Sequence, residues 1–134
     1  MPCSYDFKTA FSKFITLLVK IERVLGQMKI VHYQDVAAKE VEEGFKLKMR
    51  WLNPNGSETV AVRHCEFEPG GYSPLHSHRW EHEMFILEGQ GSVIGEKEAK
   101  AVVAGCAISI PAGETHQVKN TSEKTLRLLC MIPK

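Results

Sequence analysis

The chain has 134 residues, of which 43% are hydrophobic and 25% are charged, which is typical of one globular domain with its own core. Its formal net charge is +1, so no positive field indicates nucleic acid as a partner. The apolar run at 14–19 is far too short to cross a membrane, and we expect no membrane partner. The cysteines form no Cys-x-x-Cys pair, which favours a reducing, cytoplasmic setting with mostly buried thiols: Cys3, Cys65, Cys106 and Cys130.

Residues 6–26 differ in pattern from everything that follows. Apolar side chains recur there at spacings of three and four, which predicts an amphipathic helix of about five turns that ends near Gly26. We expect this helix to pack on the domain or on a second subunit rather than on a membrane surface. Because Met28 opens a self-contained sequence, residues 1–27 are predicted to be a helical extension and residues 28–134 the functional domain.

From residue 28 onward, short strands alternate with turn residues. The alternation of apolar and charged side chains at 45–52 predicts a half-buried strand, and residues 92–94 and 97–103 predict a hairpin around Gly95 and Glu96. The polar stretch at 37–43 is compatible with a helix. Further strands are expected at 29–33, 59–68, 83–88, 106–110, 115–119 and 125–132. This spacing predicts an all-β fold, an antiparallel sandwich or barrel.

Three of the six histidines lie within seven residues, in the stretch that runs from His76 to Glu83. Residues at even separation on a strand share a face, so His76, His78 and His82 are predicted to be in phase, with the neighbouring glutamates out of phase. Neutral imidazole is the commonest protein ligand for transition metals. The stretch therefore predicts most of a metal site.

A second ordered pattern follows, and together the two resemble the motifs of the cupins. The first cupin motif runs Gly, five residues, His-x-His, three or four residues, Glu; the second runs Gly, five residues, Pro-x-Gly, two residues, His, three residues, Asn. The matching positions are Gly70, His76 and His78, and then Gly105, Pro111, Gly113, His116 and Asn120. The resemblance covers roughly residues 29–134. It implies a cupin β-barrel, also described as a double-stranded β-helix or jelly roll, and a homodimer. The helix predicted from the spacing at 6–26 would precede this barrel.

The first motif departs from the family pattern at its glutamate. The three-residue spacing after His78 reaches His82, and the four-residue spacing reaches Glu83. A regular strand favours His82, whereas a bulge would bring Glu83 inward. The chain resembles small single-domain cupins in which histidine replaces the glutamate. We therefore predict a four-histidine site of His76, His78, His82 and His116, with Glu83 in place of His82 as the alternative.

Four neutral ligands would hold one divalent transition metal per subunit and leave two octahedral positions open. Manganese or iron is favoured by the resemblance, and zinc, nickel or copper is compatible with the ligands. The resemblance implies a metal-dependent enzyme that acts on a small organic substrate. Among its possible reactions, the resemblance favours a dioxygenase-type oxidation. The alternatives are an isomerase or lyase, a non-catalytic small-molecule-binding module, and a closed metal site that only stiffens the fold.

Four residues are candidates for a catalytic role. Glu81 and Glu83 lie beside the histidines, where they could act as bases or orient an imidazole. Arg63 shares strand parity with apolar neighbours, so it is expected to point inward, where it could bind a substrate carboxylate or lie at the rim in an ion pair. Cys130 is also expected to face the interior, where it could approach the metal and be oxidised, although packing is the simpler role. Met84 and Ile86 are predicted to line an apolar pocket.

Overall fold

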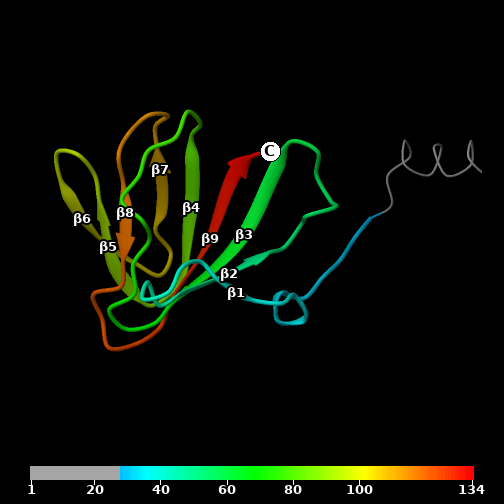
Figure 1. Ribbon diagram of the computed structural model, residues 1–134, viewed down its shortest axis with the longest axis horizontal. Helices are drawn as coiled ribbons and strands as arrows, with labels where there is room; N and C mark the ends of the chain where they lie inside the picture. The colour runs from blue at the N-terminus through cyan, green and yellow to red at the C-terminus, as the bar shows by residue number, and fades with distance from the viewer. Residues whose placement is uncertain (1–27) are drawn as a thin grey trace, which may run out of the picture. The chain divides into compact units, whose positions relative to one another are not determined.

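Nine strands account for almost all of the regular structure in the computed structural model, which describes residues 28–134 of the chain (Figure 1). A 3-10 helix, η1 (Tyr33–Asp35), precedes them. The strands are β1 (Lys39–Glu40), β2 (Leu47–Trp51), β3 (Val60–Phe67), β4 (His82–Glu88), β5 (Gln90–Ile94), β6 (Ala99–Val103), β7 (Ala107–Ile110), β8 (Gln117–Lys119) and β9 (Leu126–Pro133). The helix predicted at 6–26 and the extension predicted at 1–27 lie outside the described residues.

The strands form two antiparallel sheets. One has six strands in the order β1-β2-β3-β9-β4-β7, and the other has three in the order β6-β5-β8. Figure 1 shows β5, β6 and β8 together on one side and β3, β4 and β9 on the other. This all-β jelly-roll arrangement agrees with the prediction. No helix within residues 28–134 is long and apolar enough to cross a membrane.

The hydrophobic core lies between the two sheets. Alternate residues of β4 and β9 are buried, as the period of two requires. Ile86, Leu126 and Leu128 are fully buried in the large sheet, and Val102 and Val118 contribute from the small one. Burying an aliphatic side chain of this size stabilises the fold by about 1.5–3 kcal/mol. Both sheets therefore present one apolar face to the core, and the site is built at the edge of that core.

The strand predictions are confirmed from β2 onward, and two predictions nearer the N-terminus are wrong. Residues 29–33 contain no strand and lead instead into η1, where the His32 side chain accepts a hydrogen bond from the Gln34 amide at 3.3 Å. Residues 37–43 hold β1, which pairs with β2, rather than a helix. This segment is held by distant partners, since Tyr33 stacks on His64 with ring centroids 4.5 Å apart. Tertiary contacts decide its course, and local pattern carries little information about them.

Candidate metal centre

Backbone hydrogen bonds join the two histidine motifs. His76 and His116 form an antiparallel bridge, with each amide donating to the other carbonyl at 3.2 Å and 2.9 Å. The Gly113 amide donates to the His78 carbonyl at 2.7 Å, from a backbone with φ of +84° that favours glycine. The two stretches, 40 positions apart along the chain from His76 to His116, are therefore fixed side by side before any side chain is considered.

Four histidine rings gather at this junction. The ring centroids of His76 and His116 lie 4.7 Å apart, and those of His78 and His116 lie 5.0 Å apart. Ring nitrogens of His76, His78 and His116 all lie within 4.8 Å of one another, which is close enough for these three to share one ion. The fourth ring, His82, lies 5.2 Å from His78 and 5.4 Å from His116. Three histidines thus meet the spacing of a metal site, and His82 lies directly beside them.

Each of the three clustered histidines forms the same kind of hydrogen bond, from its Nδ1 atom to a backbone carbonyl. The Nδ1 atoms of His76, His78 and His116 lie 2.8 Å, 2.9 Å and 2.8 Å from the backbone carbonyls of Pro74, Trp80 and Glu114. A carbonyl oxygen only accepts, so each Nδ1 carries the proton and each Nε2 keeps its lone pair. An outer hydrogen bond of this kind sets the tautomer of a metal-binding histidine. The sequence gives no signal for these carbonyl partners.

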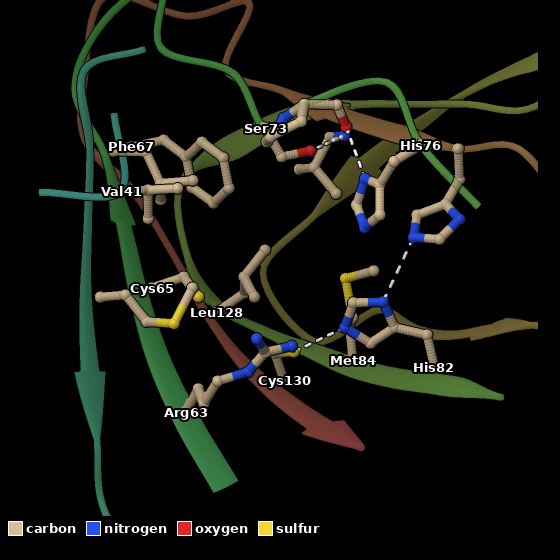
Figure 2. Close-up of a pocket in the computed structure, with 15 residues that line it drawn as sticks. Val41, Arg63, Cys65, Phe67, Ser73, His76, His82, Met84, Leu128 and Cys130 are labelled. Atoms are coloured by element: carbon tan, nitrogen blue, oxygen red, sulfur yellow. Dashed lines mark hydrogen bonds between the residues drawn. The ribbon is translucent and has the colours of Figure 1, made fainter. Parts of the chain in front are cut away.

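His82 is placed differently. It is the first residue of β4 and is only 7% exposed. Its Nδ1 lies 3.3 Å from His116 Nε2, and its Nε2 lies 2.5 Å from the sulfur of Cys130 (Figure 2). Burial above all, and then the positive charge of Arg63, lowers the pKa of His82 to about 3, so the ring is neutral. His82 points into the site, and its role as a fourth ligand stays a prediction.

Burial also lowers the pKa of His116, although its hydrogen bond to the Glu114 carbonyl acts in the opposite direction.

The strand parity that selected His82 does not extend back to His76 and His78, since β4 begins at His82. The four rings meet because of the bridge between His76 and His116 and the bond from Gly113 to His78, and not because three of them share one regular strand.

The two glutamates of the histidine stretch face solvent. Glu81 is exposed, and Glu83 is exposed on the outer face of β4, where it accepts a hydrogen bond from the Ser109 hydroxyl at 2.6 Å. The irregularity in β4 lies between Ile86 and Glu88, so it does not turn Glu83 inward. Neither glutamate lines the pocket beside the histidines.

A cavity of about 180 Å³ opens beside His76, His82 and His116 (Figure 2). Most of its wall is apolar, and Arg63, Cys130 and Ser73 are polar members. The inward orientation predicted for Arg63, Cys130 and Met84 agrees with this lining, whereas Ile86 lies deeper in the core. Three further lining residues lie outside the strands, in segments where no periodic pattern indicates which way a side chain points: Val41, Ser73 and Pro74.

Trp80 covers one side of the histidine cluster. Its ring stacks on the His78 ring, with centroids 4.7 Å apart and planes 7° apart, and the side chain remains 42% exposed. The stack restrains His78 from the solvent side, while the backbone carbonyl of the same residue accepts from His78 Nδ1. One residue therefore restrains both the position and the tautomer of His78.

Comparison with known proteins places these features in a family context. The family model for the cupin domain matches residues 63–132. The solved structure of the polyketide cyclase RemF from Streptomyces resistomycificus is 34% identical in sequence and superposes with a TM-score of 0.73, over 80% of this chain and 80% of that one.

Among curated proteins, the 1-methylthio-D-xylulose 5-phosphate methylsulfurylase of Rhodospirillum rubrum is 32% identical over 74 residues, which are 55% of this chain and 47% of the relative. Auxin-binding protein 1 of Arabidopsis thaliana is 30% identical over 87 residues, 58% of this chain and 44% of the relative. The chain thus spans about half the length of the curated relatives it matches.

Proposed function

Since the chain belongs to the cupin domain family, we propose that it is a metal-dependent enzyme that binds a small, largely apolar organic substrate beside the histidine cluster. The observation that carries the proposal is the common orientation of His76, His78 and His116. Each has its Nδ1 proton directed at a backbone carbonyl, which leaves three Nε2 lone pairs for one ion. An accidental cluster of histidines would not require the same tautomer three times.

The donor set fits a divalent transition metal. Imidazole nitrogens suit zinc, copper, iron and nickel better than calcium or magnesium, which take oxygen ligands. We propose His76, His78 and His116 as ligands and His82 as the fourth. Manganese or iron is preferred from the family resemblance, and the nitrogen donors are equally compatible with zinc, nickel or copper. When bound, such an ion supplies Lewis-acid polarisation of a substrate oxygen.

The chain's own residues would then bind and shield the substrate. Leu47, Met84 and Leu128 line the cavity and exclude water from an apolar substrate body. The neutral ring of His82 lines this cavity together with His76 and His116, and its Nδ1 lies 3.3 Å from His116 Nε2. A substrate in the cavity would therefore lie beside the histidine cluster.

We favour chemistry at a polarised carbonyl or enol over dioxygenase-type oxidation. The support is the polyketide cyclase relative, which is 34% identical across 80% of both chains. The dioxygenase reaction implied by the family resemblance stays a prediction. A non-catalytic binding module is the second candidate, since auxin-binding protein 1 is named for the ligand that it binds and is 30% identical over 87 residues.

Elemental analysis of the purified chain, followed by reloading with Mn²⁺, Fe²⁺ or Zn²⁺, tests the metal site. We expect one ion per chain in the wild type and in Glu83→Ala, which is the matched control from the solvent face of β4. We expect loss of the ion in His116→Ala. If His116→Ala retained one ion per chain, the proposed metal site would be refuted.

His82→Ala separates two roles for His82. A residue that only orients a ligand changes metal affinity by about 10–100-fold, so a larger loss assigns His82 as a ligand and a smaller one assigns it as a positioning residue.

Turnover separates the enzyme from the binding module. The metal-loaded chain is mixed with a panel of β-keto acids, enols and catechols while oxygen and substrate are both monitored. Substrate loss without oxygen consumption supports carbonyl chemistry, and stoichiometric oxygen uptake supports the dioxygenase. Stabilisation by a panel member that is never consumed supports the binding module and contradicts the proposed enzyme.

We also propose that a second copy of the chain covers the outer face of the six-stranded sheet. Phe85 and Leu87 are 41% and 43% exposed there, and Leu129 pairs with Phe85 across β4 and β9. Adjacent exposed apolar side chains of this kind are typical of subunit interfaces. Sedimentation should show a dimer that Phe85→Lys dissociates. Val103→Lys, which alters an exposed apolar residue of the other sheet, should remain dimeric, and a monomeric wild type would refute the interface.

A further inference from the structure

Arg63 is the only cationic side chain among residues 28–134 that lines the cavity. It lies on β3, with Cys65 and Phe67 on the same inward face and Cys130 opposite it on β9. Figure 2 shows its guanidinium group beside Cys130 and near His82, at the end of the cavity away from Phe67. An arginine therefore lies in a wall that is otherwise largely apolar.

The hydrogen-bonding capacity of this arginine is mostly unused. Its Nη2 donates to the sulfur of Cys130 at 2.8 Å, and thiol sulfur is a weak acceptor. Its Nε is buried and has no hydrogen-bond partner within the part of the chain that the structure describes. No carboxylate of that part lies within ion-pair distance of it.

Two other arginines of the same sheet show what a structural arginine looks like here. Arg50 on β2 pairs with Glu66, and Arg127 on β9 pairs with Glu88. Both lie on the outer face of the sheet, where the alternation places them opposite the cavity. Arg63 alone of the three has no acidic partner, although it is the one directed into the cavity, where an unpaired charge is most costly.

The size of the cavity limits what could pair with this arginine. An apolar cavity of about 150 Å³ holds one benzene molecule, so about 180 Å³ holds one ring and a small substituent. The apolar wall favours the ring, and the guanidinium favours an anionic substituent. Arginine binds a carboxylate through two parallel hydrogen bonds, and because Nε is buried, a carboxylate in the cavity would accept them from the two terminal nitrogens.

We propose that Arg63 is the specificity-determining residue of the cavity and that it binds the carboxylate of a small monoanionic ligand with an apolar body about the size of one aromatic ring. This inference rests on the proposed function only in taking the cavity as the substrate site. The carboxylate supplies the counter-charge that the fold leaves out, and the rest of the ligand occupies the apolar end.

Benzoate and benzamide are the probes, since they share shape and differ in charge. Calorimetric titration is carried out on the full chain, both stripped of metal with a chelator and loaded with Mn²⁺. In the stripped wild type, we expect benzoate to bind about tenfold or more tightly than benzamide, the difference typical of a charge-assisted pair. Arg63→Met should bind the two probes equally. Arg127→Met, which removes a cation from the outer face of the same sheet, should keep the wild-type preference.

Two results of these titrations would contradict the role proposed for Arg63. Equal binding of the two probes by the wild type overturns the proposal, as does a benzoate preference that survives in Arg63→Met. Should Arg63→Met fail to fold, Arg63→Lys keeps the charge without the planar fork, and its preference should fall between the wild type and none. A preference as large as the wild type's in Arg63→Lys would overturn the two-bond geometry. The stripped protein separates this inference from the metal site, because an arginine-dependent preference can survive there even if no variant binds metal.

Discussion

Asn120 offers a sharp test of the link between motif and structure. This side chain is 0% exposed and makes contacts on both sides of its amide. Its Nδ2 lies 3.0 Å, 3.1 Å and 2.7 Å from the carbonyls of Phe67, Glu68 and Lys124. Its Oδ1 accepts from the amide and the hydroxyl of Ser122 at 3.0 Å and 2.9 Å. It therefore joins the end of β3 to the loop that follows β8.

Replacing Asn120 with alanine removes all of these side-chain hydrogen bonds. An amide nitrogen has two hydrogens, so the three carbonyls share about two full hydrogen bonds, and Oδ1 contributes two more. At about 1 kcal/mol net for each bond, Asn120→Ala should lower the free energy of unfolding by about 4 kcal/mol. That is a large share of the roughly 5–15 kcal/mol that stabilises a typical domain.

Urea unfolding of the metal-stripped chain at neutral pH measures the loss. Ser122→Ala is the graded control, since it removes one hydroxyl and should cost about 1 kcal/mol. Asn120→Asp should be at least as destabilising as Asn120→Ala, because a carboxylate would face two or three carbonyl oxygens. A loss below about 1 kcal/mol in Asn120→Ala would refute the reasoning, since it would mean that the buried bonds contribute no more than a surface contact.

Two further predictions concern pH and backbone packing. The pKa of His82 is about 3 in the folded chain and about 6.5 for an ordinary histidine, so below pH 6.5 the unfolded chain binds more protons than the folded chain. The stability contributed by the neutral ring is therefore present above pH 6.5 and is lost as the pH falls toward 3. Burial also lowers the pKa values of His64 and His116, so denaturation of the metal-stripped chain near pH 5 should show a loss relative to neutral pH of which His82 contributes about 2 kcal/mol. His82→Gln should reduce that loss, and an unchanged loss would contradict the assignment. A Cβ at Gly91 would lie 2.5 Å from the Lys119 carbonyl, so Gly91→Ala should cost about 1–3 kcal/mol in urea unfolding. At Gly95 the nearest atom is the flexible Glu114 carboxylate, so Gly95→Ala should cost less; the reverse order would show that β5 and β8 separate easily.

Strand positions from β2 onward follow from apolar or alternating runs bounded by turn residues, and β4 and β9 show the alternating burial that such a pattern predicts. The N-terminal part of the domain does not follow from such runs. β1 has two residues, both exposed, and η1 lies against the outer face of the sheet through the stack of Tyr33 on His64. Neither element has a periodic pattern to read. The burial of His64, at 3% exposed, depends on this covering segment and was equally invisible in the sequence.

The spacing of His76, His78 and His116 within two ordered motifs was sufficient to identify the metal-binding candidates, since a family motif records positions that meet in space. Tertiary structure alone decided how they meet. Backbone bonds from His76 to His116 and from Gly113 to His78 bring the motifs together, and three carbonyls orient the rings. Sequence parity suggested that Arg63 points inward, but the absence of any acidic partner for it in the described chain emerges only when β2, β3, β4 and β9 are assembled. The reason is physical: alternation along one strand selects a face, whereas charge compensation depends on every strand that shares that face.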